Sequence, residues 1–357
     1  MVKKCIIYLG YNDPREYKRG VENVILSQSR ALGIDVDKYY FFCSSKDEVF
    51  DWEDITCISF KNSAFRYLNY NKTIRKIRVK YQDVFIHSHD FIASLFLIYN
   101  IDCMTVHDGL YYLRRESKHK LRFLHYVVEK IVFYKVKRTH FISEFTKSKT
   151  LYPVNKTDYS IIPNTTPFEF IKNCNSIPHK QFSSKLNLFT VRGIQERTRI
   201  DLLVDLATTV KQSKLDIHIF VAGKGELLDF YKADVCERGL EEYITFLGYV
   251  SDLEVASYYA SCDLVIVPAE YGEGFGLPII EGYCFDKPVI ASNVCAIPEV
   301  IIDKEHLFNN NTSSIFRLID SFYRSSKNNS ERVYIDYYKE NFAESVIHKL
   351  YNEEIYR

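Results

Sequence analysis

The sequence predicts an α/β protein with two domains, each built around a doubly wound, mainly parallel sheet. In both halves of the chain, apolar runs of strand length alternate with segments whose apolar residues have helical spacing. A polar stretch at 166–184, which contains Pro167 and Pro178, separates the two halves. The length of 357 residues suits two domains of ordinary size.

The first half is predicted to form a domain over 1–165, and 166–184 is predicted to be a linker. The expected strands of this half cover 5–10, 36–43, 55–60, 84–89, 103–107, 140–143 and 159–164. The expected helices cover 20–32, 71–80, 91–99 and 117–135. Repeated βα units bring the carboxyl ends of the strands to one edge of the sheet, where ligands bind in such folds.

The second half is predicted to form a domain over 185–330, and 331–357 a final helix that packs back toward the first domain. The expected strands cover 186–193, 217–223, 244–248, 263–268 and 288–292. The expected helices cover 200–210, 226–238, 252–260, 279–285 and 312–325. Ser251 precedes the third of these helices and is expected to cap it.

The composition indicates a soluble globular protein, with 46% hydrophobic and 26% charged residues. The nine cysteines are odd in number and contain no CxxC pair, which favours reduced thiols in the cytosol over a disulfide framework. Their spacing matches no metal site. No signal peptide and no segment of transmembrane length is evident, so we expect a cytoplasmic protein.

The charges are unevenly distributed, although the net charge is only +1. Six basic residues and no acid lie in 66–80, and nine basic residues lie in 114–138 against Glu116 and Glu129. The second half holds more acids. This pattern indicates an anionic surface, such as the inner face of a cell membrane, as a partner of the first domain. The alternative is an ordinary solvated helix, and nucleic acid is disfavoured because no reading motif is present.

The stretch 269–301 carries the most specific pattern in the chain. An apolar strand is followed by a turn that contains three glycines, and Pro278 stands where the first turn of a helix begins. Glycines allow close backbone approach to a ligand, and the N–H groups at a helix start favour an anion. Glu273 and Glu281, with seven residues between them, supply acceptors for hydroxyl groups. The pattern predicts a sugar-nucleotide site; the alternative is a surface loop with solvated glutamates.

These residues resemble the donor-site signature of retaining glycosyltransferases of the GT-B fold, in particular glycosyltransferase family 4. The resemblance implies two Rossmann-like domains that face a central cleft. It implies that Glu273 lies by the donor sugar and that Glu281 holds the nucleotide ribose. It also assigns four consecutive residues to the donor-binding loop: Gly274, Phe275, Gly276 and Leu277. The turn at 285–287 departs from the family, which often has Cys-Gly before the next strand.

Two arginines follow the first strand of the second half and are predicted to neutralise the donor diphosphate. Arginine offers a fixed fork of donors that suits phosphate oxygens. The resemblance implies an Arg and a Lys five residues apart, and Arg192 and Arg197 keep this spacing. Arg199 is an alternative to Arg197, because the following Asp-Leu-Leu segment lies one residue further on than in the family.

Three further donor contacts come from turns. Gly223 ends a predicted buried strand with a tight turn. Val250 lies in a segment that resembles the one whose backbone contacts the nucleotide base in the family. Gly20 opens the first predicted helix, whose N-terminus would face the diphosphate. The family often has two glycines there, and Arg19 stands at the first of these positions.

Polar residues also end two predicted strands of the first half. His107 stands where the resemblance implies a histidine near the transferred sugar, although a single histidine is more often a structural hydrogen-bonder. Asp108 follows it, and His89 and Asp90 end a neighbouring strand. The latter three are predicted to lie on the acceptor side or to be structural.

The sequence therefore predicts a retaining hexosyltransferase that moves a sugar from a UDP- or GDP-linked donor to a glycan or lipid-linked acceptor. Assembly of a bacterial surface polysaccharide, O-antigen or capsule, is the expected setting. No cofactor and no metal are expected, because basic side chains carry the phosphate charge. The alternatives are another GT-B enzyme, such as a nucleotide-sugar epimerase or a phosphorylase, and a non-catalytic sugar-binding module.

Overall fold

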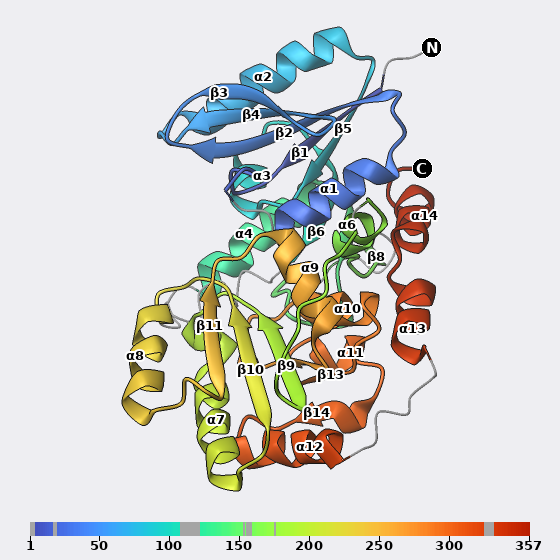
Figure 1. Cartoon of the computed structure of the whole chain (residues 1–357). Helices are drawn as coiled ribbons and strands as arrows, with labels where there is room; N and C mark the ends of the chain where they lie inside the picture. Colours follow the sequence, from blue (N-terminus) through green and yellow to red (C-terminus); the bar gives the residue numbers. More distant parts are fainter. Residues whose placement is uncertain are drawn as a thin grey trace. The chain divides into compact units, whose positions relative to one another are not determined.

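A computed structural model describes residues 4–16, 20–107, 122–152, 154, 159–174, 176–324 and 332–357. The chain divides into two compact units (Figure 1). The first unit comprises Met1–Thr165 and Glu344–Arg357, and the second unit comprises Thr166–Ala343.

The first unit is built on an eight-stranded sheet with the strand order β3-β4-β2-β1-β5-β6-β7-β8. The strands are β1 (Lys4–Leu9), β2 (Val36–Ser44), β3 (Glu48–Trp52), β4 (Ile55–Lys61), β5 (Asp83–Ser88), β6 (Ile101–Val106), β7 (Val136–Phe141) and β8 (Tyr159–Ile161). β3 runs antiparallel to β4, and the remaining pairs are parallel. The sequence analysis missed β3, because this edge strand is only partly buried and lacks an apolar run.

Helices cover both faces of this sheet, as the sequence predicts (Figure 1). They are α1 (Val21–Ala31), α2 (Arg66–Lys80), α3 (Phe91–Phe96), α4 (Arg122–Lys135), α5 (Glu144–Ser148) and α14 (Glu344–Glu354). Alternate residues of β1 enter different cores: Ile7 packs with Tyr70 of α2, whereas Ile6 packs with Ile25 of α1. This alternation follows from the two-residue period of a strand and confirms the doubly wound fold.

The second unit is built on a six-stranded parallel sheet with the order β11-β10-β9-β12-β13-β14. The strands are β9 (Leu186–Val191), β10 (Ile217–Ala222), β11 (Ile244–Gly248), β12 (Leu264–Val267), β13 (Val289–Ser292) and β14 (Leu307–Phe308). From β9 the chain adds β10 and β11 on one side of β9. It then adds β12, β13 and β14 on the other side. The strand order therefore reverses between β9 and β12, and ligands bind beyond the carboxyl ends of strands at such a point.

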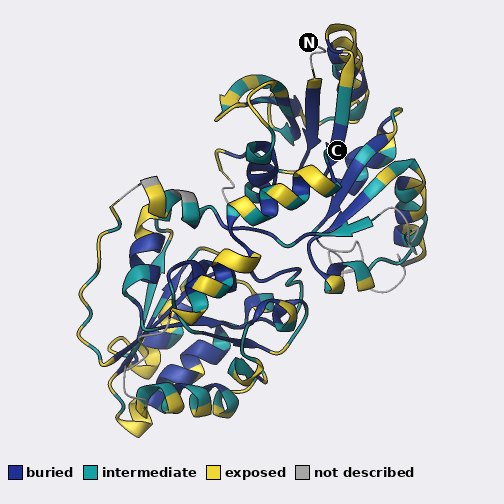
Figure 2. Ribbon diagram, turned by 90° about the vertical axis from the view of Figure 1, so that its right-hand side faces the viewer, coloured by how far each residue is buried: buried dark blue, intermediate teal, exposed yellow. Residues whose placement is uncertain are grey.

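The helices of the second unit flank its sheet, and their outward faces are exposed (Figure 2). They are α6 (Phe168–Cys174), α7 (Asp201–Ser213), α8 (Leu228–Arg238), α9 (Asp252–Ser261), α10 (Leu277–Cys284), α11 (Ile297–Val300), α12 (Thr312–Arg324) and α13 (Val333–Asn341). Ser251 caps α9 as predicted, with its side chain accepting from the N–H of Glu254. Within the described segments, no helix has both the length and the apolar character that a membrane span requires.

Two predicted boundaries were wrong. The stretch 166–184 is not simply a linker, because it contains α6, which packs in the second unit. Lys172 of α6 donates to the carbonyl of Cys284 at 2.9 Å, and this bond anchors the end of α10. The predicted final helix is two helices, of which α13 belongs to the second unit and α14 to the first. Ile347 and Tyr351 of α14 are buried in the core of the first unit.

Candidate donor site

The predicted donor residues of the second unit gather where its strand order reverses. Arg192 directly follows β9, and the glycine loop at 269–276 directly follows β12. The Arg192 N–H donates to the carbonyl of Ala222 at 2.9 Å, so the ends of β9 and β10 lie side by side. Residues that the sequence separates by about 80 positions therefore share one edge of the sheet.

Arg192 and Glu273 form an ion pair that the sequence did not reveal. Nη2 of Arg192 donates to Oε2 of Glu273, and their side chains are only 4% and 13% exposed. Nε of Arg192 is buried and has no hydrogen-bond partner among the described residues. A buried N–H without an acceptor is costly, so this arginine is suited to receive an anionic oxygen.

The glycine loop has the backbone that the sequence predicts. Gly272 has φ 68° and Gly276 has φ 101°, a region that favours glycine over other residues. Gly276 precedes α10, Pro278 lies in its first turn, and no side chain caps the helix start. The N-terminal N–H groups of α10 are therefore oriented to attract an anion. The carbonyl of Glu273 accepts from the N–H of Ala296 at 3.2 Å, which ties the loop to the start of α11.

Glu281 lies one turn into α10 and is buried. The hydroxyl of Tyr259, on α9, donates to Oε2 of Glu281 at 2.7 Å. The Tyr259 ring is itself fixed by Phe285, which stacks on it at 5.7 Å between centroids, and by Phe189, which meets it edge-on at 5.0 Å. Sequence reasoning missed Tyr259, because a tyrosine among the apolar residues of a helix carries no signal that distinguishes it from core.

The structure separates the two candidate arginines of the β9 loop. Arg199 is held by two carboxylates, with Nη2 at 2.9 Å from Asp201 and Nη1 at 2.6 Å from Glu270. Arg197 has no ion pair with a described residue, and its Nη1 donates to the carbonyl of Gly272, next to Glu273, at 3.4 Å. The geometry favours Arg197 over Arg199 as a partner for a ligand at the loop.

Gly223 has a structural reason to be glycine. A Cβ at this position would lie 1.8 Å from the carbonyl oxygen of Arg192, and its φ is 131°. The Gly223 N–H donates to the carbonyl of Gly248 at 2.7 Å, so this turn joins the ends of three strands. Val250 is half-buried between Gly248 and the cap of α9. Contact of either residue with a donor stays a prediction.

In the first unit, His107 follows β6 and is half-buried. Its Nε2 lies 2.7 Å from Nδ1 of His89, which follows β5 and is only 2% exposed. Burial lowers the pKa of His107 to about 3 and lowers the pKa of His89 as well, so both rings are neutral at pH 7. His89 therefore contacts His107 directly, which fits the structural alternative of its prediction, and a role on the acceptor side stays a prediction.

Asp90 is also structural. Its carboxylate accepts from the N–H groups of Ile92 at 2.7 Å and Ala93 at 3.1 Å, and so caps α3. Burial raises its pKa to about 6. The cap fits the structural alternative that the sequence left open, because a short side chain that caps a helix is committed to the backbone. Asp108 and Arg19 lie outside the described residues.

Gly20 is the cap residue of α1 and has φ 81°. Close to it, the structure reveals a titratable group that we had not singled out. Glu22 lies in the first turn of α1, is buried, and accepts from Nδ2 of Asn12 at 3.0 Å. Burial raises its pKa to about 7. Its sequence position, an acid near a helix start, is equally typical of a solvated residue.

The basic side chains of the first unit differ between α2 and α4 in their partners, and the predicted basic face stays a prediction. None of the six basic side chains of α2 is in an ion pair with a described residue. On and after α4, by contrast, Lys135 donates to the carbonyl of Ser94 at 2.8 Å and Lys137 pairs with Asp102 at 2.6 Å. Arg138 donates to the carbonyl of Glu354. These charges stabilise the fold, and residues 114–121 lie outside the described segments.

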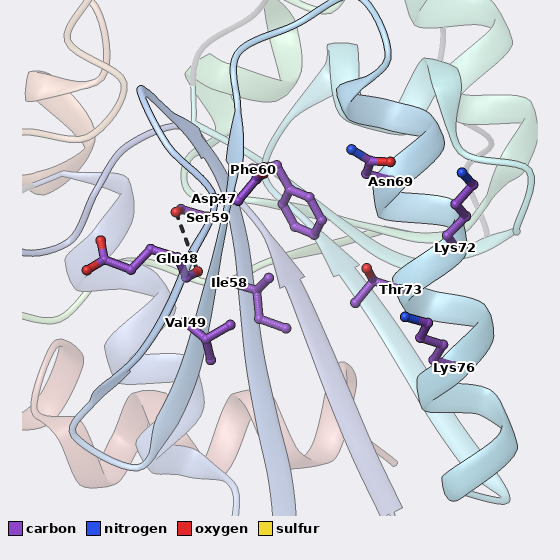
Figure 3. A pocket seen from close by; sticks show the side chains of 10 residues that line it. All are labelled: Asp47, Glu48, Val49, Ile58, Ser59, Phe60, Asn69, Lys72, Thr73 and Lys76. Atoms are coloured by element: carbon purple, nitrogen blue, oxygen red, sulfur yellow. Dashed lines mark hydrogen bonds between the residues drawn. The ribbon is translucent and has the colours of Figure 1, made fainter.

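A pocket of about 460 Å³ lies between α2 and the β3–β4 hairpin (Figure 3). Lys72, Thr73 and Lys76 of α2 line one side, and Ile58 and Phe60 of β4 line the other. Two carboxylates line the hairpin side: Glu48 pairs with Arg15 at 2.9 Å, and Asp47 accepts from the backbone N–H of Lys61 at 2.8 Å, so neither pairs with the α2 lysines. The α2 side of this pocket therefore keeps a net positive charge.

Comparisons with known proteins agree with this site. Residues 175–341 match the family model described as glycosyl transferases group 1. An uncharacterised 41.2 kDa protein in the cps region of Klebsiella pneumoniae is 30% identical over 135 residues, which are 38% of this chain and 35% of that protein. The O-antigen chain mannosyltransferase B of Escherichia coli is 46% identical over 68 residues, 19% of this chain and 18% of that protein. These matches thus span about a third or less of the curated relatives.

Solved structures match over nearly the whole chain. The sucrose-phosphate synthase of Thermosynechococcus elongatus superposes with a TM-score of 0.73 at 15% identity, covering 98% of both chains. Anabaena HepE in complex with UDP and glucose superposes with a TM-score of 0.74 at 15% identity, covering 99% of both chains. At such low sequence identity, these matches show the fold alone.

Fold and site together define the class of GT-B glycosyltransferases. Residues 175–341, in the second unit, match the glycosyl transferases group 1 family, and the whole chain has the GT-B fold. The predicted fold class is therefore confirmed.

Proposed function

We propose that the protein is a retaining hexosyltransferase that transfers a sugar from a UDP- or GDP-linked donor to a glycan or lipid-linked acceptor. The carrying observation is the buried Arg192–Glu273 pair beside the uncapped start of α10. HepE was solved with UDP and glucose, and two relatives are described by a cps region and by O-antigen chains. These descriptions support surface polysaccharide assembly, at the cytoplasmic side of the membrane, as the setting.

Each donor residue has a distinct task in this proposal. Arg192, Arg197 and the first N–H groups of α10 stabilise the charge that develops on the departing diphosphate. Glu281, oriented by Tyr259, accepts hydrogen bonds from the ribose hydroxyls. Glu273 lies by the donor sugar and at the same time fixes the guanidinium of Arg192. The resemblance to family 4 supports retention of configuration, with the departing phosphate helping to deprotonate the acceptor.

Incubation with a panel of UDP- and GDP-sugars tests this function against its alternatives. A transferase should release the nucleoside diphosphate slowly by donor hydrolysis, and faster with an acceptor. An epimerase would convert the sugar without lasting release of nucleotide. A phosphorylase would need pyridoxal phosphate bound to a lysine. Binding of a sugar with no turnover under any condition would leave a non-catalytic module.

The two glutamates should separate binding from turnover. Glu281→Ala should weaken the binding of UDP or GDP by about 1–3 kcal/mol, because hydrogen bonds to a charged partner are lost. Glu273→Ala should reduce turnover more than nucleotide affinity, because this residue lies by the sugar. Calorimetry with the nucleoside diphosphate, paired with the donor assay, measures both effects. An equal loss of nucleotide affinity in the two variants would contradict the separate roles.

Activity should survive removal of metal ions. The phosphate charge is assigned to arginines and a helix start, which do not require a divalent ion. Among the described residues, no group of three or more His, Cys, Asp or Glu side chains is placed to hold a metal. The donor assay before and after EDTA treatment measures this. A loss of activity that Mg²⁺ or Mn²⁺ restores would contradict the proposed chemistry.

We further propose that α2 attaches the protein reversibly to an anionic membrane. Besides its six basic residues, α2 and its cap residue carry exposed apolar side chains. Phe65 is 68% exposed and Val79 is 86% exposed. Phe65, Leu68 and Phe96 line a second pocket at the start of α2. Basic and apolar groups on one surface suit a bilayer interface better than water alone. Attachment would bring the enzyme to a lipid-linked acceptor.

Lys76→Glu should weaken binding to vesicles that contain anionic lipid by about tenfold, because each basic residue near such a surface contributes about 1 kcal/mol. Co-sedimentation at low and high salt measures the effect, and binding should fall as salt rises. Lys232→Glu, an exposed lysine on α8 of the second unit, is the matched control and should bind as the unaltered protein does. Equal binding to neutral and anionic vesicles would refute the attachment.

A further inference from the structure

Three histidine rings form a stack inside the first unit. His87 and His89 lie at and after the end of β5, and His107 follows β6. The ring centroids of His87 and His89 are 4.9 Å apart, and those of His89 and His107 are 5.1 Å apart, with nearly parallel planes. Nδ1 of His89 lies 2.7 Å from Nε2 of His107, so these two nitrogens share one proton.

The surroundings of His89 decide which nitrogen holds that proton. Nε2 of His89 is buried and has no partner among the described residues. If Nε2–H of His107 were the donor, His89 would carry its own proton on Nε2, and a buried N–H would be stranded. Buried N–H groups without acceptors are rare, because they lose their bond to water and gain none. The alternative places the proton on Nδ1 of His89, which donates to a bare Nε2 of His107.

We propose that His89 is a positioning residue that fixes His107 as the Nδ1–H tautomer, so that His107 presents one hydrogen-bond donor to an oxygen of the sugar substrate. This inference rests on the proposed transferase function. Nδ1 of His107 has no hydrogen bond to a described residue and is not among the buried atoms without a partner, and the residue is half-buried. A neutral His107 ring with its proton on Nδ1 can donate to a hydroxyl or ring oxygen of a sugar. This hydrogen bond does not require a charged imidazolium.

The network behind His89 limits its movement. Nε2 of His87 lies 2.7 Å from Oγ1 of Thr105, and Nδ1 of His87 lies 2.9 Å from the hydroxyl of Tyr356. Thr105 in turn lies 3.0 Å from Nδ1 of His140. The stack is thus held by strands β6 and β7 and by the segment that follows α14. Burial lowers the pKa of His87 and His89, which supports one shared proton between His89 and His107.

The tautomer is directly measurable. The full chain, labelled with ¹⁵N in histidine, is examined at pH 7.5 by long-range ¹H–¹⁵N correlation, and His107→Gln identifies the His107 signals. We expect His107 to show a protonated Nδ1 and a bare Nε2. The opposite pattern, a protonated Nε2 on His107, would overturn the proposal. This outcome does not depend on activity, so failure of the transferase function would show separately in the donor panel.

Two variants of His89 test its effect on the substrate. His89→Phe keeps a ring in the stack but removes the donor, and should give mixed His107 tautomers and about tenfold lower turnover. His89→Asn keeps an amide donor near the same position and should restore one tautomer and most of the turnover. UDP and GDP affinity should be unchanged in both variants, because Arg192 and Glu281, which bind the nucleotide in this proposal, lie in the second unit. Should His89→Phe fail to fold, the unaltered protein and His89→Asn still decide the proposal. Unaltered His107 signals and turnover in His89→Phe would refute it.

Discussion

Arg192→Met is expected to lower turnover by about 10²–10³-fold, the usual effect of removing one donor that stabilises charge in a transition state. The side chain is 4% exposed and its guanidinium pairs with Glu273, so its charge is held at the glycine loop. The change also leaves Glu273 without its partner. Loss of one member of a buried pair typically costs about 3–5 kcal/mol of folding free energy.

Steady-state kinetics and thermal unfolding separate the two effects. Arg192→Met/Glu273→Gln should recover part of the lost stability, because the unpaired carboxylate is gone, but none of the turnover. Arg199→Met is the control, since Arg199 also pairs with acids, but its partners are Asp201 and Glu270 and not Glu273. Turnover in Arg192→Met within a few-fold of the unaltered protein would contradict a role in phosphate stabilisation.

The first unit is expected to lose stability steeply below pH 6.5. Burial lowers the pKa of four histidines of this unit: His87, His89, His107 and His140. Each stays neutral in the folded state but takes up a proton on unfolding below pH 6.5. The stability that neutral histidines contribute is therefore complete above pH 6.5 and is lost as the pH falls.

Two buried carboxyls oppose this trend. Burial raises the pKa of Glu22 to about 7 and that of Asp90 to about 6. As the pH falls, each carboxyl therefore becomes protonated at a higher pH in the folded protein than in the unfolded chain. On unfolding near pH 5, the four histidines take up about four protons and the two carboxyls release about two. The net uptake is therefore about two protons. At about 1.4 kcal/mol per proton and pH unit, the free energy of unfolding should fall by about 3 kcal/mol per unit.

The single tryptophan makes this loss measurable in the first unit alone. Trp52 lies in β3 and packs near Tyr40, with 6.0 Å between ring centroids. Its fluorescence during urea unfolding at pH 7.5, 6.5 and 5.5 should show a falling midpoint. His140→Gln should reduce the slope by about one proton, whereas His218→Gln, in the second unit, should leave it unchanged. A Trp52 transition that is independent of pH would contradict the prediction.

Features that depend on residues close together in the chain were predictable from the sequence. The alternation of apolar runs and helical spacing defined both sheets, because each strand and helix buries one face with its own period. The glycine loop, Pro278 and the spacing of Glu273 and Glu281 were readable because one loop and one helix contain them all. Arg192 was readable because it directly follows a buried strand.

Contacts between side chains from distant segments are visible only in the folded protein. The Arg192–Glu273 pair and the Tyr259–Glu281 bond join elements that no local pattern connects. The same holds for the cap that Asp90 provides for α3 and for the contact of His89 with His107. The sequence pattern of a histidine or aspartate after a strand is the same whether water or a protein core surrounds the side chain. Its protonation and its partners depend on that surrounding, which packing between distant segments sets.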